Sequence, residues 1–465
     1  FTTGSLIDSG DAHTDIIASN LRIYSTGAIV PNTINALDTS INNLSANVAN
    51  GGLYVSNDKN ITINTIDSIT VNKVEINATT TLRTDNAQSN IVAIGDVVLS
   101  SLGNINDANS NYIQANTLIL NSEAGIGTNL NNLNTTVANL VITNTTSGDV
   151  YISETDALNI NSITQSSSGV VNVISGGSIT QSGLISSTSG DVTIQANGSI
   201  SQNANVSSTS GNVSLTSTTS SIIMNDGVSI SSTSGDVALN ANNDLSISII
   251  NTSGNVNLTA TNGSIIDNLS TEASNVIGNA LVLNAGTGIG ASTSNADINT
   301  TVISLSAVNT NSGDIYINET DTLTINAVSN VASGIIDILT GDSITQNGNI
   351  VSNSGIINLR AINGDITSNA NVSSNSAVIN VTASAGSIIM TNGATTSSSG
   401  DINFIANTNI QTELINTSSN VNLRAINGYV KDIDGDSLIT ATTLTIESEA
   451  GIGTNLNNLN TTVAN

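Results

Sequence analysis

Apolar and polar residues alternate in short segments of this chain, and the pattern restarts at a regular interval. In Ser189–Thr209, SGDVTIQANGSISQNANVSST, the aliphatic positions are Val192, Ile194, Ala196, Ile200 and Val206. Ser-Gly turns recur at Gly148, Gly169, Gly190 and Gly211, with the same interval between each turn and the next. Alternation with a period of two is typical of strands that bury one face. Each interval therefore predicts three short strands joined by turns.

A single interval buries too few aliphatic side chains to offset the backbone entropy lost on ordering it. Stacked intervals remove this difficulty, because each one bonds to the intervals above and below it. Val, Ile, Thr, Ser, Asn and Gly dominate the composition, which favours strand over helix. We therefore expect an all-β parallel β-helix, or β-solenoid, of about 20–21 residues per rung with no globular second domain. Two flat β-layers are the structural alternative.

A longer repeat contains these rungs. The tripeptide GIG begins at Gly125, Gly288 and Gly451, which are separated by two equal steps. We expect residues 1–127 to form an irregular, shortened repeat and 128–290 and 291–453 to form two full super-repeats. Residues 454–465 would then begin a further copy. Ser122–Asn139 and Ser448–Asn465 are identical, and the chain does not start with Met, so we expect a window cut from a longer protein.

Composition and charge exclude several functions. The 34 acidic and 7 basic residues give a net charge of −27, which opposes binding to nucleic acid or to anionic lipid. The absence of Cys removes disulfides, thiol catalysis and Cys-based metal sites. No apolar run is long enough for a transmembrane helix, and we expect no membrane insertion.

Several motifs together resemble the haemagglutination repeats of filamentous haemagglutinin-like and other large bacterial surface adhesins. They are SGDVTIQA at Ser189–Ala196, GSITQSGLISS at Gly177–Ser187 and AGTGIG at Ala285–Gly290. The resemblance covers most of residues 125–453. It implies a secreted, right-handed parallel β-helix that projects from the bacterial cell surface and takes part in attachment. It carries no catalytic residues to this chain.

Acidic turns are the first candidate for chemistry. Asp follows a Ser-Gly turn at five places: Asp149, Asp191, Asp236, Asp314 and Asp401. A line of Ca²⁺ sites is one interpretation, since hard oxygen ligands suit that ion. We favour the other, in which Asp serves the turn through side-chain bonds to backbone.

The sequence DIDGD contains a sharper calcium candidate, with carboxylates at Asp432, Asp434 and Asp436. An EF-hand loop that began at Asp432 would need Gly at its sixth place and Glu at its twelfth, where Ser437 and Thr443 stand. A bound Ca²⁺ and a solvated loop both remain open, and the fold requires no cofactor.

Tyr54, Tyr151 and Tyr316 occupy similar places beside inward aliphatic residues. If they face outward, they could contact another shaft or a glycan, or simply cover a strand. An enzyme is not expected, because cations are sparse and His13 is the single histidine. We expect a structural and adhesive shaft segment of an extracellular, cell-surface protein, with lateral contacts to other copies of itself. The alternative is a repeat module that binds carbohydrate or a target-cell surface, with or without Ca²⁺.

Overall fold

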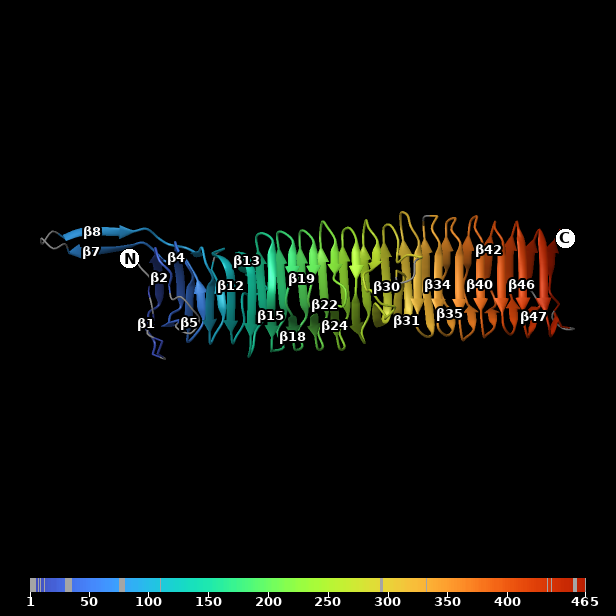
Figure 1. The fold of residues 1–465 in the computed structure, drawn as a ribbon, viewed down its shortest axis with the longest axis horizontal. Coiled ribbons are helices and arrows are strands. Elements are labelled where there is room, and N and C mark those ends of the chain that lie inside the picture. Colours follow the sequence, from blue (N-terminus) through green and yellow to red (C-terminus); the bar gives the residue numbers. More distant parts are fainter. Residues whose placement is uncertain are drawn as a thin grey trace. The chain divides into compact units, whose positions relative to one another are not determined.

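The chain forms a β-solenoid of about 19 turns in a computed structural model. The structure describes residues 6, 8, 10–11, 13–29, 36–74, 80–108, 110–292, 296–331, 333–432, 434–435, 437–454 and 458–464. Within these ranges the regular elements are all strands, and none is a helix. Consequently no helix in the described part of the chain is long and apolar enough to span a membrane. The chain divides into two compact units, Phe1–Thr218 and Thr219–Asn465, and each is a stack of parallel strands (Figure 1).

The strands of the first unit are β1 (Ile16–Ile17), β2 (Asn20–Ser25), β3 (Leu37–Ser40), β4 (Asn43–Val48), β5 (Leu53–Asn57), β6 (Ile61–Ile63), β7 (Ile69–Val74), β8 (Thr80–Asp85), β9 (Ile91–Ala93), β10 (Val97–Ser101), β11 (Ile105–Asp107), β12 (Tyr112–Ser122), β13 (Leu133–Asn144), β14 (Val150–Glu154), β15 (Leu158–Gln165), β16 (Val171–Ser175), β17 (Ile179–Gln181), β18 (Ile185–Ser187), β19 (Val192–Ala196), β20 (Ile200–Gln202), β21 (Val206–Ser208) and β22 (Val213–Ser217).

The strands of the second unit are β23 (Ile222–Met224), β24 (Ser229–Ser232), β25 (Val237–Ala241), β26 (Leu245–Ile247), β27 (Ile249–Thr252), β28 (Val256–Ala260), β29 (Ile265–Asp267), β30 (Val276–Ala285), β31 (Ile298–Asn309), β32 (Ile315–Glu319), β33 (Leu323–Asn330), β34 (Ile336–Thr340), β35 (Ile344–Gln346), β36 (Ile350–Ser352), β37 (Ile357–Ala361), β38 (Ile366–Ser368), β39 (Val372–Ser374), β40 (Ile379–Ala383), β41 (Ile388–Met390), β42 (Thr395–Ser398), β43 (Ile402–Ala406), β44 (Ile410–Thr412), β45 (Leu414–Thr417), β46 (Asn420–Ala425), β47 (Tyr429–Asp432), β48 (Leu438–Ala441), β49 (Thr443–Ser448), β50 (Gly451–Ile452) and β51 (Thr461–Val463).

A regular rung has one strand of five residues followed by two strands of three, as in β19, β20 and β21. Buried and half-buried residues alternate along all three strands, which confirms the predicted period of two. Each strand lies in parallel register over its counterpart one rung away, so Val171 pairs with Val192 and Val192 with Val213. The predicted length of the rung is therefore confirmed.

The interior is aliphatic along the strands and polar at many corners. Val192 and Val213 are fully buried, and they form part of a column of inward aliphatic side chains. Ser208 ends its strand at a corner, where it is buried, and its hydroxyl donates to the Gly190 carbonyl at 2.9 Å. The same Oγ accepts the Gly211 amide at 2.9 Å. Corner serines therefore satisfy turn groups that would otherwise be buried without partners.

The regular rung is interrupted where the long strands occur. In the second unit, β30 pairs with β27 near its start and with β28 near its end, so it runs through the corner where other rungs turn. β31 lies over the whole of β30 and also lacks that turn. β12 and β13 form the equivalent pair in the first unit. We call each pair of long strands a junction. Because a long strand takes the place of two shorter strands and the corner between them, a rung at a junction has two sides in place of three.

Above each junction, the five-residue strand of the rung lies in a different stack from the one that it occupies below the junction. We call this change the exchange of sides. β33 lies over the second half of β31 and then carries two separate strands, β35 and β36. β13 and β15 repeat this arrangement in the first unit, where β15 carries β17 and β18. A one-residue register shift allows the split, after Leu140 in one unit and after Leu305 in the other. One side of the rung thus becomes two.

The GIG element belongs to these junctions. Gly125 and Gly127 have φ values of 116° and 64°, and Gly288 and Gly290 have values of 135° and 63°. A Cβ on Gly127 would lie 2.3 Å from the Tyr151 carbonyl oxygen of the next rung. Both the positive φ and the close approach require glycine, which explains why the tripeptide marks the super-repeat.

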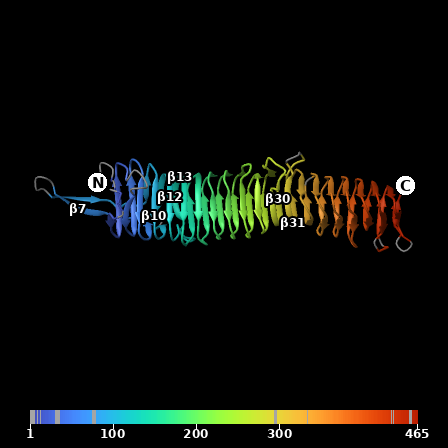
Figure 2. The ribbon, with the colours of Figure 1, turned by 60° about the horizontal axis from the view of Figure 1, so that its bottom comes forward.

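An antiparallel hairpin, β7–β8, projects from the rungs of the first unit (Figure 2). Its base is held by Arg22, whose Nη1 donates to the Asn86 carbonyl at 2.7 Å and whose Nη2 lies 3.6 Å from Asp85 Oδ2. The hairpin lies within the segment 1–127 that the sequence predicts to be irregular.

Candidate functional site

The five acidic turns all use their carboxylates to bind the next rung. Each Oδ1 accepts a backbone amide from the turn above, and the donors are Val170 for Asp149 (2.9 Å), Asn212 for Asp191 (2.7 Å), Asn255 for Asp236 (2.7 Å), Ile335 for Asp314 (2.7 Å) and Asn420 for Asp401 (3.1 Å). Hydrogen bonds from the Ser419 hydroxyl and the Asn420 amide lower the pKa of Asp401. The carboxylates connect rungs, as the turn-chemistry interpretation predicts.

Asp191→Ala is expected to lower the free energy of unfolding of the first unit by about 1 kcal/mol, because it leaves the Asn212 amide without its carboxylate acceptor. Urea unfolding followed by circular dichroism measures the loss. Asp191→Asn keeps an acceptor at Oδ1 and should recover most of it. If EDTA destabilised the native protein by the same amount as Asp191→Ala, a metal would hold this turn and the interpretation would be wrong.

The predicted calcium loop is only partly described. Asp436 lies outside the described residues, and so does the position between Asp432 and Asp434. Asp432 is fully buried, and its Oδ1 accepts the amides of Asp434 (3.0 Å) and Gly435 (2.9 Å). Asp434 Oδ2 accepts the side-chain amide of Asn392, two rungs away, at 2.6 Å. The two described carboxylates thus accept hydrogen bonds from the loop itself and from another rung.

Asp432 has counterparts at the end of the matching strand in the other copies. Asp107 Oδ1 accepts the Asn131 side chain at 2.7 Å, and its Oδ2 accepts that of Asn134 at 2.5 Å. Asp267 Oδ1 accepts the Asn275 side chain at 2.5 Å, and burial raises the pKa of Asp267. Amide side chains therefore donate to the carboxylate at two of these three corners.

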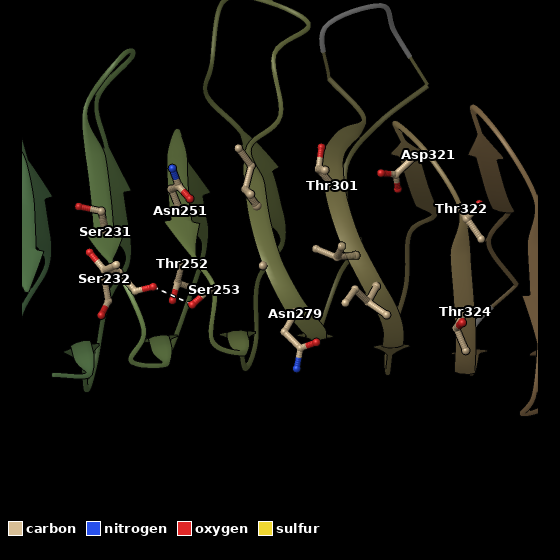
Figure 3. Close-up of a pocket in the computed structure, with 15 residues that line it drawn as sticks. Ser231, Ser232, Asn251, Thr252, Ser253, Asn279, Thr301, Asp321, Thr322 and Thr324 are labelled. Atoms are coloured by element: carbon tan, nitrogen blue, oxygen red, sulfur yellow. Dashed lines mark hydrogen bonds between the residues drawn. The ribbon is translucent and has the colours of Figure 1, made fainter. Parts of the chain in front are cut away.

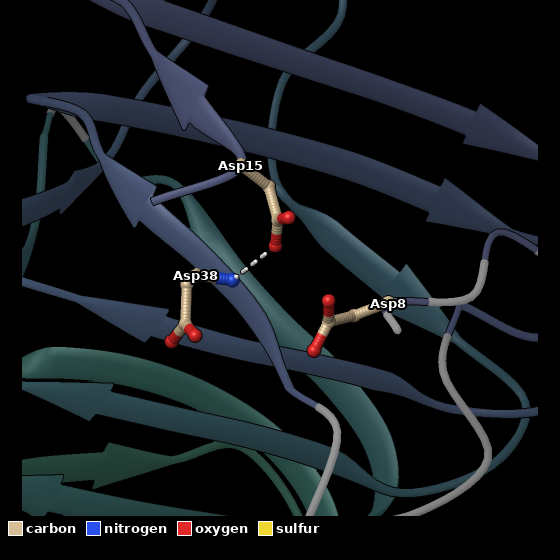
Figure 4. A group of neighbouring side chains, drawn as sticks. All are labelled: Asp8, Asp15 and Asp38. Atoms are coloured by element: carbon tan, nitrogen blue, oxygen red, sulfur yellow. Dashed lines mark hydrogen bonds between the residues drawn. The ribbon is translucent and has the colours of Figure 1, made fainter. Parts of the chain in front are cut away.

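Three carboxylates that the sequence did not single out lie close together near the start of the chain. Asp8, Asp15 and Asp38 each place an oxygen within 4.8 Å of the other two (Figure 4). Asp15 Oδ2 also accepts the Asp38 amide at 2.9 Å, and Asp8 Oδ2 accepts the Gly10 amide at 3.0 Å. The spacing would suit one hard cation. Their positions 8, 15 and 38 have no motif spacing that could have revealed them.

Two buried glutamates were also missed. Glu154 and Glu319 occupy matching places in the two super-repeats, within the sequences SETD and NETD, and both are at most 3% exposed. Thr300 Oγ1 donates to Glu319 Oε2 at 2.7 Å, and the Val302 amide donates to it at 3.1 Å. Thr135 donates equally to Glu154 at 2.7 Å. Burial raises the pKa of Glu319 to about 7. The repeated Glu-Thr-Asp sequence was the available signal.

The three tyrosines face outward and are half-buried, in agreement with the outward placement that the sequence analysis assumed. The structure does not bring Tyr54 and Tyr151 together. Tyr54 lies on β5, whose stack continues through β10 and β12, whereas Tyr151 lies on β14, which stacks over Ile126 and β11. Tyr316 lies in the other unit, on β32. Burial, and secondly the adjacent Asp314, raise the pKa of Tyr316.

The described cations of the second unit lie at the surface beside partners. Arg360 contacts Asp337 at 2.5 Å, Arg424 contacts Glu447 at 3.1 Å, and Lys431 Nζ lies 4.7 Å from the centre of the Tyr429 ring. His13, 3.1 Å from Asp11, is exposed.

An open groove of about 940 Å³ lies at the junction of the second unit. Its floor is the middle of the two long strands, where the turn is missing, and includes Gly278 and Ile303. Figure 3 shows Ser231, Ser232, Asn251, Thr252 and Ser253 on one side of the long strands and Asp321, Thr322 and Thr324 on the other, with Asn279 and Thr301 between them. We call this hollow the junction groove.

Comparisons with known proteins add no identity to this geometry. No protein-family model matches the chain, no curated protein matches it, and no solved structure matches it.

Proposed function

We propose that this chain is a structural and adhesive shaft segment of a large secreted bacterial surface protein or extracellular fibre. Its role in attachment would be mechanical: it would hold a contact site away from the cell and carry the load between the two. It would act outside the cell, with other copies of itself and a target surface as partners, and without catalysis.

The unbroken parallel ladder is the observation that carries this proposal. In the second unit Ile315 pairs with Ile336, Ile336 with Ile357, and Ile357 with Ile379, and each pair belongs to a five-residue ladder. Tension along such a stack is shared by many backbone hydrogen bonds per rung, together with the burial of the aliphatic interior.

Side-chain ladders reinforce the backbone on the outer face. Asn422 donates to Asn403 at 2.7 Å, Asn403 to Asn380 at 2.9 Å, and Asn380 to Asn358 at 2.9 Å. Asn358 donates at 3.2 Å to the Asp337 carboxylate, which ends the row. The amides all point the same way and therefore polarise one another, which strengthens each bond. This row links five successive rungs and supports a load-bearing role.

Surface charge is consistent with a shaft in saline surroundings. The net charge of −27 keeps the chain soluble, and salt screens its self-repulsion. Lateral association of copies would therefore strengthen as ionic strength rises.

The exchange of sides at each junction means that the five-residue strands before and after it lie in different stacks. A surface that contacts neighbouring copies would therefore lie on different sides of the shaft before and after each junction.

Immunogold electron microscopy of producing cells tests the proposal. Antibodies raised against the second unit should label material outside the cell, and deletion of residues 291–453 should bring a label placed beyond the deletion nearer to the cell by about 40 Å, at about 4.8 Å per rung. Label confined to the cell interior would contradict the proposal. An unchanged label distance in the deletion strain would contradict the spacer role specifically.

A further inference from the structure

The junction groove owes its existence to the missing turns. In the rungs before it, β24 and β27 end in turns at Thr233 and Ser253, and the Ser253 hydroxyl donates to the Thr233 carbonyl at 2.7 Å. The next two rungs run straight through this corner as β30 and β31. The turn at Asp321 and Thr322 then closes the far side. The hollow is thus the space that two absent turns would have filled.

The floor of the groove combines apolar and polar groups. Ile277, near the start of β30, is 38% exposed, as are several other outward isoleucines of this unit. Ile303, in the middle of β31, is 66% exposed, the highest value for a large hydrophobic side chain among the described residues of the second unit. Gly278 lies beside Ile277, and a Cβ there would approach Val256 Cγ2 to 3.0 Å. The walls supply hydroxyl and amide groups from Ser, Thr and Asn. An amphipathic ligand with many hydroxyl groups matches this lining.

The first unit provides an internal comparison. The same positions of its junction, on β12 and β13, carry Gln114 where the second unit has Ile277, and Ala138 where it has Ile303. Thr136 matches Thr301. The junction fold therefore does not require exposed isoleucines. The high exposure of Ile303 in the second unit points to a role beyond folding.

Charge and topology narrow the class of ligand. The residues that line the groove include Asp321 and no cation, in a chain of net charge −27, so anionic ligands are repelled. A peptide could not add a strand to the floor, because β27 pairs with one edge of β30 and both β32 and β33 pair with β31. A volume of about 940 Å³ lies in the range of small-molecule sites.

We propose that the junction groove binds a neutral oligosaccharide. The C–H faces of the sugar rings would lie on Ile277 and Ile303, and the ring hydroxyls would bond to the walls. This role goes beyond the proposed shaft, which needs no ligand, so either one can fail without the other.

Isothermal titration calorimetry and saturation-transfer NMR on the full chain test the proposal. The probes are neutral tetrasaccharides of glucose, mannose, galactose and N-acetylglucosamine, with tetragalacturonate as the acidic comparison. At least one neutral probe should bind, and tetragalacturonate should not. Binding of no neutral probe, or equal binding of the acidic one, would overturn the assignment.

Variants that copy residues of the first unit locate the site. The double change Ile277→Gln and Ile303→Ala installs residues that a junction of this chain already tolerates, and it should weaken binding at least tenfold. Ile405→Ala removes another partly exposed isoleucine of the second unit, outside the groove, and should change the affinity less than twofold. If the double variant fails to fold, Ile303→Ala alone serves, since that side chain is mostly exposed. Unchanged affinity in the folded variant would refute the groove as the site.

Discussion

Phe404→Ala is expected to lower the free energy of unfolding of the second unit by about 3–5 kcal/mol. Phe404 is 1% exposed and is the largest fully buried side chain of the described residues. It stacks between Val381 and Leu423 of the adjacent rungs, which are held in ladder register and cannot close the cavity. Urea unfolding followed by circular dichroism measures the loss.

The neighbouring residue gives a matched control for this prediction. Ile405 lies on the same strand, faces outward and is 38% exposed, so Ile405→Ala should cost less than about 1 kcal/mol. Because rungs in a solenoid contact only their neighbours, hydrogen exchange in Phe404→Ala should rise first in β40, β43 and β46. Equal losses from the two changes would contradict the assigned interior.

Stability of the second unit is expected to fall by about 3 kcal/mol between about pH 4.5 and pH 7, because the buried Glu319 must lose its proton there. Its pKa is about 7 in the folded chain against 4.5 for an ordinary glutamate. Folding thus favours the protonated form. The stabilising effect is complete below pH 4.5, declines as the pH rises through 7, and changes no further above that.

Glu319→Gln should remove this pH dependence, since the amide is neutral at every pH and still offers an oxygen to Thr300 and the Val302 amide. The variant should be more stable than the native chain above pH 7. Urea unfolding at pH 4.5, 6 and 8 measures the difference. Glu447→Gln, at an exposed position that pairs with Arg424, should keep the native pH dependence. A native-like slope in Glu319→Gln would show that other groups cause it.

The regular rungs could be predicted because their residues repeat. Val171, Val192 and Val213 recur at the interval of the Ser-Gly turns and stack in register. The parallel topology followed from a physical requirement, since an isolated rung cannot satisfy its own backbone groups. Asp191 was likewise predictable, because Asp after a turn has a known local chemistry. That its carboxylate accepts the amide of Asn212 in the next rung could be predicted only with the register between the rungs in hand.

The junctions could not be predicted, because they depend on a turn that is absent. The segment containing Gly278 has no Ser-Gly-Asp turn, yet nothing local shows whether the chain bends or continues straight there. Only the pairing of β30 with both β27 and β28 decides it. The junction groove and the exchange of sides in the second unit follow from this non-local pairing. The separation of Tyr54 from Tyr151 follows from the equivalent pairing of β12 with β9 and β10 in the first unit.

The candidate metal sites show the same limit. The spacing of Asp432 and Asp434 drew attention to one loop, whereas the described carboxylates that form a group of three within 4.8 Å are Asp8, Asp15 and Asp38. Asp15 and Asp38 meet because β1 pairs with β3. Their proximity depends on contacts between rungs, so their spacing along the sequence could not predict it.

Single-molecule force spectroscopy, with the chain held at its two ends, tests most directly whether the ladders carry load. The account predicts a series of discrete events, each lengthening the chain by about 60–75 Å as one rung of about 21 residues is pulled out. Phe404→Ala should lower the force of the events nearest to it. Smooth extension at low force, without steps, would show that the ladders do not resist tension and would contradict the proposed shaft.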